Sequence, residues 1–255
     1  ALAVKKAQEK FGWELEGELK VLFLTHRLIA RKAGYEALWT AYNERGGFAR
    51  DRFQGGEDPI AAFFINRIEP VIESWRHGKV GRTISLLSDR RKPIAAQEEK
   101  ARVKAALDDL VTLVDGGATV EAVLKHIEAA ELVPLLDDLE AGISGRIAPA
   151  EAGTPEAEHQ AFMAKLLTIP YVEISNYRAV LQNNLPYSTK HGVKGDQFRN
   201  VLVVLDDAGA NWNQYSFGKL LAGTDTSESR IKRSRNLFYV CCSRAKDKLI
   251  VADLG

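Results

Sequence analysis

Short apolar runs and helically spaced apolar positions alternate along the chain. Three short apolar runs predict buried strands: residues 20–26 (KVLFLTH), 200–206 (NVLVVLD) and 248–253 (KLIVAD). A short strand that ends near Thr189 is also predicted. Helical spacing follows the first run and precedes the last. Because parallel strands need crossover connections, this order predicts an α/β fold with a mostly parallel sheet flanked by helices.

The centre of the chain carries helical patterns. Five segments have apolar residues at helical spacing: 29–44, 58–75, 98–114, 119–132 and 132–143. The second is predicted as one helix or as a helix broken at Pro70, and Thr119 is the predicted N-cap of the fourth. Residues 233–246 (RSRNLFYVCCSRAK) also have helical spacing, although their FYVCC centre would suit a strand.

This central helical block differs in character from the α/β segments on either side of it. We therefore expect a discontinuous α/β domain formed by residues 1–82 and 169–255, with an inserted helical subdomain at 83–168. Within the insertion, residues 147–158 (IAPAEAGTPEAE) are rich in Pro, Ala and Glu and predict a linker.

The composition is that of an ordinary globular protein, with 45% hydrophobic and 27% charged residues among 255. Since no apolar run approaches the ~20 residues of a membrane-spanning helix, we expect no membrane partner. Cys241 and Cys242 are the only cysteines and are adjacent, which indicates a reduced, cytoplasmic protein. The sequence has no Cys/His cluster with zinc-ligand spacing, so no metal site is expected.

The net charge of +1 hides an uneven distribution. Residues 98–158 contain 14 Asp/Glu and 5 Lys/Arg, whereas residues 230–248 contain seven Lys/Arg and one Asp. The basic segment fits either a phosphate or nucleic-acid surface or one solvated helix face. An acidic surface repels phosphate, so our hypothesis for the insertion is a protein partner or an autoinhibitory contact.

A loop containing glycine and lysine precedes the second long strand. Residues 189–198 read TKHGVKGDQF, with glycines at 192 and 195 and Lys194 between them. Glycines allow the backbone to bend sharply or to approach a ligand closely, and the lysine favours an anionic ligand. The same pattern fits a glycine turn with a solvated lysine, and the loop alone does not separate the two interpretations.

A second motif lies just before the last strand. Residues 235–251 (RNLFYVCCSRAKDKLIV) combine Leu-x-Tyr-Val with Ser-Arg-Ala and an apolar run. Together the two motifs resemble TxHxxKGxEF and RRLxYVxxTRAxxxL, which occur in the C-terminal half of UvrD/Rep-type helicases of superfamily 1. The matched positions are Thr189, His191, Lys194, Gly195 and Phe198 in the first motif, and Leu237, Tyr239, Val240, Arg244 and Ala245 in the second.

The start of the chain resembles a third part of that family. In relatives, the motif that opens the second RecA-like domain is an apolar strand followed by an aromatic residue and an arginine. His26 occupies the aromatic position, which stacks on adenine, and Arg27 occupies the position of an arginine that reaches the γ-phosphate. The resemblance therefore covers nearly the whole chain and implies a RecA-like domain, with the insertion at the position of an accessory subdomain that pivots over duplex DNA.

The resemblance implies roles for the matched residues. Arg244 is the expected arginine finger with Arg27 as its partner, because guanidinium groups neutralise the charge that develops on a γ-phosphoryl group. The expected nucleotide-binding residues are His26, Lys194, Gly195 and Gln197, and the residues expected at single-stranded DNA are Thr189 and His191. Gln197 stands where relatives have Glu, so its contact with the ribose would be a neutral hydrogen bond. Asp196 replaces an apolar residue, and Ser243 replaces Thr but keeps the hydroxyl.

Two parts of a helicase ATPase site are not recognisable in the sequence. The phosphate loop GxxxxGK[ST] does not occur, and neither does an acidic Walker B pair. In relatives both belong to the first RecA-like domain. We therefore expect the C-terminal part of an ATP-dependent DNA helicase, which binds ATP with Mg²⁺ and works on single-stranded or duplex DNA only with that N-terminal domain, and which is inactive alone. The alternative is a catalytically inert helicase-like module for DNA or protein docking, which Gln197 and the acidic insertion favour.

Aromatic residues are expected mainly in the core. Trp39, Trp75 and Phe63 lie at helical spacing and are predicted to pack inside. Trp212 and Tyr215 follow a strand in a polar loop, where they either stack on DNA bases or anchor the loop.

Overall fold

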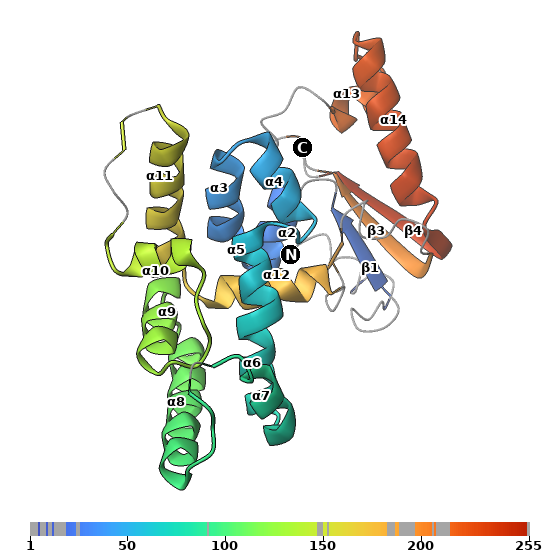
Figure 1. Cartoon of the computed structure of the whole chain (residues 1–255). Coiled ribbons are helices and arrows are strands. Elements are labelled where there is room, and N and C mark those ends of the chain that lie inside the picture. Colours follow the sequence, from blue (N-terminus) through green and yellow to red (C-terminus); the bar gives the residue numbers. More distant parts are fainter. Residues whose placement is uncertain are drawn as a thin grey trace. The chain divides into compact units, whose positions relative to one another are not determined.

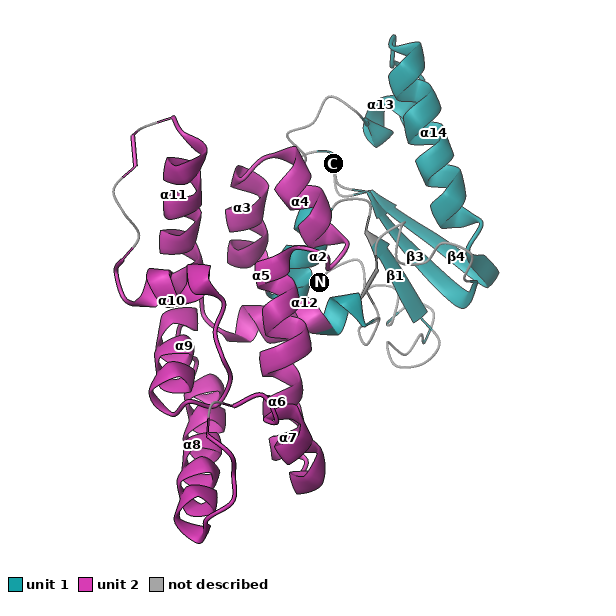
Figure 2. Cartoon of the chain, in the orientation of Figure 1, with its two compact units in different colours: residues 1–34, 179–255 teal, residues 35–178 magenta. Residues whose placement is uncertain are grey.

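The chain forms two compact units, shown in Figures 1 and 2. The computed structural model describes residues 19–23, 26–90, 92–146, 150–151, 153–182, 187–188, 197–205, 207 and 215–253, together with positions 5, 9 and 12. Unit 1 consists of residues 1–34 and 179–255, and unit 2 consists of residues 35–178. The chain therefore leaves unit 1 to build unit 2 and then returns to complete unit 1.

Unit 1 is a mixed α/β structure around one parallel sheet. Its strands are β1 (Leu19–Phe23), β2 (Tyr187–Ser188), β3 (Phe198–Leu205) and β4 (Ala245–Asp253). Their order across the sheet is β2-β1-β3-β4, and every neighbouring pair is parallel. The predicted strands and the parallel sheet are confirmed, including the short strand that ends beside Thr189, but the prediction that residues 248–253 are buried is wrong, because every residue of β4 is exposed or half-buried.

The burial of each strand follows its place in the sheet. β3 lies between two neighbours, and its residues from Asn200 to Leu205 are all buried, as expected for a strand covered on both faces. β4 lies at one edge, and Leu249 and Val251 remain partly exposed there. An irregularity in the pairing of β3 with β4 falls between Phe198 and Asn200, at the start of both strands.

Two helices cover one face of the sheet. They are α13 (Phe217–Ala222) and α14 (Glu228–Cys242). The core beneath them consists of Leu22, Val201, Val203, Leu205, Phe217, Leu237 and Cys241. The choice between helix and strand for residues 233–246 is therefore resolved as a helix that ends at Cys242. A further helix, α2 (His26–Ala33), lies against β1 and β2 and buries Leu28, Ile29 and Ala30.

Unit 2 is entirely helical in the residues described. Its elements are α3 (Glu36–Glu44), α4 (Gly47–Gln54), α5 (Pro59–Phe63), the π-helix η1 (Phe64–Ile68), α6 (Glu69–Arg76), α7 (Val80–Leu86), α8 (Gln97–Asp115), α9 (Val120–Ala129), α10 (Asp137–Ile143), α11 (Pro155–Thr168) and most of α12 (Val172–Leu181). The predicted N-cap of α9 is confirmed, since the Thr119 hydroxyl accepts a hydrogen bond from Ala122 N at 3.3 Å.

One helix prediction is wrong, and a second is decided in favour of the first of its two alternatives, an unbroken helix. Residues 29–44 do not form one helix, because Gly34 adopts φ 80°, a left-handed conformation that ends α2 before α3 begins. Residues 58–75 form a continuous helical segment that passes through Pro70. Proline lacks an N–H and crowds the carbonyl one turn earlier in an α-helix, and the wider π-helical turn directly before α6 accommodates this.

The predicted domain boundaries at 82/83 and 168/169 both fall inside unit 2. The helices before residue 83 pack on the rest of the helical unit, as the ring of Tyr42 shows, with its centroid 4.8 Å from that of Phe162. Tyr35 and Tyr177, near the two ends of the unit, have ring centroids only 5.5 Å apart. An insertion with neighbouring ends fits into a host domain without displacing it, and the ends of unit 2 are neighbours in this sense.

Two further expectations are settled by the helices of unit 2. The predicted linker at 147–158 overlaps α11, which begins at Pro155 and is capped by the Thr154 hydroxyl accepting from Ala157 N at 3.2 Å.

Phe63 is buried as predicted, whereas Trp39 and Trp75 are half-buried, and Trp75 donates to Asp108 at 2.9 Å. In the part of the chain that the structure describes, no helix is long and apolar enough to cross a bilayer.

Candidate functional site

The ends of the two sequence motifs meet at one edge of the sheet. β3 and β4 are parallel neighbours, and Phe198 lies opposite Ala245 at the start of both strands. The backbone N–H of Phe198 donates to the carbonyl of Arg244 at 2.8 Å. Gln197 is exposed directly before Phe198, and Arg244 is half-buried. The fold thus brings the last residues of the TKHGVKGDQF motif beside the arginine of the second motif.

The position of Arg244 follows from the way α14 ends. Leu237 and Cys241 are buried in the core and fix the last turns of the helix against the sheet. Ser243 closes the helix with helical dihedral angles, and its hydroxyl donates to Val240 O at 3.0 Å. Arg244 follows at once, and its N–H donates to Cys241 O at 3.3 Å. Its backbone is therefore held by both the helix end and β3.

A lysine that sequence reasoning did not single out lies near this edge. Lys20 is in β1 opposite Val201, only three residues along β3 from Phe198. It is 8% exposed, and its Nζ lies 5.6 Å from the centroid of the Phe198 ring. A buried lysine is uncommon, and an aromatic face stabilises its charge. The sequence signal was a lysine at the start of an otherwise apolar strand.

Several expected site residues cannot be placed. Thr189, His191, Lys194 and Gly195 lie outside the described residues, as do Asp196 and Trp212. Because β2 ends at Ser188 and β3 begins at Phe198, the chain segment that contains the first four connects these two strands in the sequence. Their roles stay predictions from the sequence.

His26 and Arg27 lie at the opposite edge of the sheet. They begin α2, directly after the carboxyl end of β1, where Phe23 pairs with Val204. Val204 is six residues beyond Phe198, roughly 20 Å at ~3.3 Å per residue. That separation is several times the length of an arginine side chain. The structure therefore does not bring Arg27 and Arg244 together, and the expected pair of arginines at one phosphoryl group is corrected to Arg244 alone.

The carboxyl end of β3 carries an acidic residue with a structural role. The Asp207 carboxylate accepts hydrogen bonds from Phe217 N at 3.0 Å, Gly218 N at 2.7 Å and the Ser216 hydroxyl at 3.2 Å. It thereby caps α13 from a distant position in the sequence, since Ser216 makes no side-chain cap of its own. Within the described residues, no group of three or more His, Cys, Asp or Glu side chains is arranged to hold a metal ion.

Three basic residues of α14 differ in their surroundings. Arg230 makes two hydrogen bonds to the Asp225 carboxylate, at 2.7 and 2.6 Å, and these bonds lower the pKa of Asp225 to about 2. This pair ties the turn before the helix to its first turn. Lys232 and Arg235 are instead exposed on the helix face that also carries Tyr239, whose exposure is 71%. Arg244 follows the end of this helix.

Tyr215 and the cysteines belong to the packing of unit 1. The ring of Tyr215 is nearly parallel to that of Phe217, with centroids 6.2 Å apart, and it packs against the core under α13. Of the two roles considered for Tyr215, the structure gives that of a loop anchor. Both cysteines are free thiols, and burial raises the pKa of Cys242.

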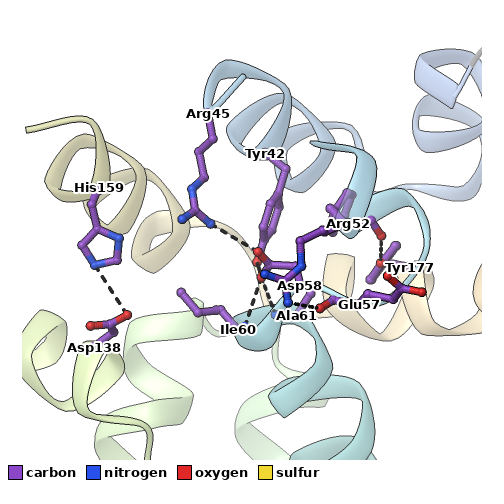
Figure 3. A network of polar contacts seen from close by, with 11 residues as sticks. Tyr42, Arg45, Arg52, Glu57, Asp58, Ile60, Ala61, Asp138, His159 and Tyr177 are labelled. Atoms are coloured by element: carbon purple, nitrogen blue, oxygen red, sulfur yellow. Dashed lines mark hydrogen bonds and ion pairs between the residues drawn. The ribbon is translucent and has the colours of Figure 1, made fainter. Parts of the chain in front are cut away.

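Unit 2 contains a buried polar cluster centred on Asp58, drawn in Figure 3. One carboxylate oxygen of Asp58 accepts from the Tyr42 hydroxyl at 2.9 Å and from the N–H groups of Ile60 and Ala61. The other oxygen is paired with Arg45 at 3.4 Å. Burial, together with the nearby carboxylate, raises the pKa of Tyr42 well above its usual value, so the hydroxyl remains a donor. Asp58 is thus a helix cap whose oxygens are already occupied.

The acidic residues of the predicted insertion are extensively paired with cations. The ion pairs join Asp115 to Arg76, Glu99 to Arg90 and Arg102, Asp108 to Lys104, Glu121 to Lys125, Glu131 to Lys92 and Arg102, and Glu140 to Arg146. Several of these cations lie outside residues 98–158. The surface around residues 98–158 is therefore less negative than the number of charged residues in that segment alone indicates.

Comparison with known proteins assigns nothing further. No family model matches the sequence, and no curated protein matches it. The residues at the amino edge of the sheet and the surfaces around them are therefore the features on which a function can be based.

Proposed function

We propose that this chain is the second RecA-like domain of a UvrD/Rep-type DNA helicase, with unit 2 as its accessory subdomain. A parallel sheet with crossover helices suits such a domain, and the insertion leaves and re-enters it at neighbouring points. The observation that carries the proposal is the hydrogen bond from Phe198 N to Arg244 O. It places together two motifs that, in the resembling family, act on the same nucleotide.

In this proposal, Arg244 neutralises negative charge during phosphoryl transfer. A guanidinium group supplied from a second domain stabilises the charge that develops on the γ-phosphoryl oxygens. The backbone of Arg244 is fixed at both its N–H and its carbonyl, so little reorganisation is needed when the domains close. Gln197, exposed at the same edge, would donate a neutral hydrogen bond to the ribose.

The proposal requires a phosphate loop, which the 255 residues do not contain. An N-terminal RecA-like domain would supply that loop and the ligands for Mg²⁺, which assists the transfer by neutralising phosphate charge. The exposed face of α14, with Lys232, Arg235 and Tyr239, is the surface we assign to that domain, because it is the solvent-exposed side of the helix whose end positions Arg244.

The charge of the two units is consistent with DNA at unit 1. Unit 1 has 18 Lys/Arg and 11 Asp/Glu, a net charge of +7, whereas unit 2 has 17 Lys/Arg and 23 Asp/Glu, a net charge of −6. A polyanion is attracted to the first and repelled by the second. Single-stranded DNA contacts are therefore assigned to unit 1, where the sequence places Thr189 and His191.

DNA-stimulated ATP hydrolysis by this 255-residue chain, compared with that by the complete gene product, tests the proposal. We expect turnover only in the longer protein, because the chain holds an arginine finger without a phosphate loop. Turnover in neither would favour the inert docking module, for which Gln197 in place of Glu is the supporting feature. Turnover in the short chain alone would mean that the nucleotide binds elsewhere.

A further inference from the structure

Lys20 is a buried cation to which the proposed function gives no role. It is 8% exposed and lies in β1 opposite Val201. Alternate residues of a strand share a face, so Lys20 lies in the same row as Leu22, which belongs to the core under α13 and α14. Burying an ammonium group costs free energy that burying a methionine here would not cost, so stability alone does not account for the lysine.

The pairing of β3 with β4 is irregular at its start. Phe198 pairs with Ala245 and Asn200 pairs with Lys248, so two steps along β3 face three steps along β4. An extra residue in one strand interrupts the hydrogen-bond ladder and lets the two strands shift locally. Side chains are therefore needed to fix the backbone of Phe198, whose N–H donates to Arg244 O at 2.8 Å.

Side-chain contacts between Lys20 and Phe198 and between Arg199 and Asp247 lie at this irregular region. Nζ of Lys20 is 5.6 Å from the centroid of the Phe198 ring, and that ring packs against the core. Nε of Arg199 donates to the Asp247 carboxylate at 2.8 Å, and both of those side chains are more than half exposed. A cation held over a ring away from water is attracted more strongly than the members of a solvated ion pair, so the first contact is the one that fixes the backbone.

We propose that Lys20 is a positioning residue, which acts through the ring of Phe198 to hold the start of β3 in the register that places Arg244 beside Gln197. The consequence for catalysis rests on the proposed function, because Arg244 is the residue that would meet the γ-phosphoryl group. Lys20 itself does not touch the nucleotide. A lysine serves here better than a leucine, because the attraction between ammonium and ring fixes where the ring lies, whereas apolar packing has no preferred direction.

The first part of the test uses the 255-residue chain without nucleotide. Lys20→Met keeps an unbranched side chain but removes the charge, and Lys20→Arg keeps the charge. Amide hydrogen exchange measured by NMR should be about tenfold faster at Phe198 in Lys20→Met and near the wild-type rate in Lys20→Arg. The amide of Val203, buried in the middle of the same strand, should exchange at an unchanged rate.

A second variant tests the same contact from the other side. Phe198→Leu keeps the cation and removes the ring, and it should accelerate exchange at position 198 by a similar factor. Unchanged exchange at this position in Lys20→Met and in Phe198→Leu would overturn the proposal. Equal acceleration at positions 198 and 203 would also overturn it, because that result means a general loss of stability.

The second part measures DNA-stimulated ATP hydrolysis by the complete gene product. Lys20→Met should lower kcat about tenfold and leave KM for ATP within about twofold, because a displaced Arg244 loses its contact in the transition state rather than in the bound substrate. Lys20→Arg should restore turnover. Arg199→Met, the matched control at the same irregularity, should stay within about twofold of the wild type.

Wild-type turnover in Lys20→Met, or an equal loss in Arg199→Met, would overturn the positioning role. A complete gene product that shows no turnover at all would instead contradict the helicase proposal. The exchange measurement would then still decide whether Lys20 holds the start of β3, so the two proposals can fail separately.

Discussion

Arg244 and Asp207 illustrate how single residues acquire a role through the backbone they contact. The backbone of Arg244 is placed by two hydrogen bonds, one that its N–H donates to Cys241 O and one that its carbonyl accepts from Phe198 N. Asp207 follows β3 as an acidic residue at a strand end, a common position for metal ligands and catalytic acids, but its carboxylate is engaged in capping α13. The side chain alone would have suggested chemistry, whereas its contacts show a structural role.

Replacing Asp207 with Ala should lower the stability of unit 1 without changing how the strands of the sheet pair. The substitution leaves Phe217 N, Gly218 N and the Ser216 hydroxyl without their acceptor. We expect a loss of about 1–2 kcal/mol in the free energy of unfolding, as for other helix caps. Urea unfolding monitored by circular dichroism measures it, and Asp109→Ala, an exposed acid on α8, is the control. An unchanged urea midpoint in Asp207→Ala would show that the cap is not needed.

At the scale of elements, the turn before α14 is held by an ion pair that titrates. Hydrogen bonds from Arg230 lower the pKa of Asp225 to about 2, below the value of about 3.9 for an unfolded chain. The folded state therefore favours the charged carboxylate. Its contribution to stability is present above pH ~4 and is lost as the pH falls toward ~2.

The substitution Asp225→Asn removes the stabilisation by the Asp225–Arg230 ion pair at every pH. The free energy of unfolding of the wild type should exceed that of the variant by a constant amount near neutral pH. That difference should shrink between about pH 4 and pH 2, where the wild-type carboxylate becomes protonated. Urea titrations of both proteins across this range measure it. A difference that stays constant down to pH 2 would contradict the Asp225–Arg230 assignment.

Elements were predictable from the sequence where local periodicity decides them. The runs that became β1 and β3 are apolar enough to need burial on their own, and Thr119 had the residue type of an N-cap. The π-helical turn η1 was not predictable, because it depends on how the helix passes Pro70 while keeping Phe64 and Ile68 buried. The break at Gly34 was also missed, since apolar spacing continues through it.

The location of Arg27 was partly implied by the sequence. A residue that follows a strand and a residue that precedes a parallel strand lie at opposite edges of a sheet. The predicted parallel sheet therefore already separated Arg27 from Arg244, and the family resemblance obscured this. Lys20 was hidden for another reason, since only the fold places it near the ring of Phe198.

The whole molecule consists of two units whose boundary no local pattern marks. Residues 35–82 look like crossover helices of an α/β domain, but their apolar faces pack on residues of the later helices, as Phe53 does on Tyr177 with ring centroids 4.2 Å apart. Such contacts join positions more than a hundred residues apart and leave no periodic signal. Unit 2 is therefore larger than the acidic segment that first indicated a separate helical region.

Residues 35–178 should fold as a separate chain, because the unit has its own core and Tyr35 lies beside Tyr177. We expect cooperative urea unfolding with a helical circular dichroism spectrum. Asp58→Ala should lower its free energy of unfolding by about 2–3 kcal/mol, through a lost cap and an unsatisfied buried Tyr42 hydroxyl. A chain that is unfolded in buffer would show that unit 2 is not an independent insertion.

The most direct measurement of the central claim is DNA-stimulated ATP hydrolysis by the complete gene product carrying either Arg244→Ala or Arg27→Ala. Loss of an arginine finger lowers turnover by about 10³–10⁵-fold. We predict that loss for Arg244→Ala, with a modest change in ATP affinity, and near wild-type chemistry for Arg27→Ala at the opposite edge of the sheet. Wild-type turnover in Arg244→Ala would contradict the account, as would an equal loss in both variants.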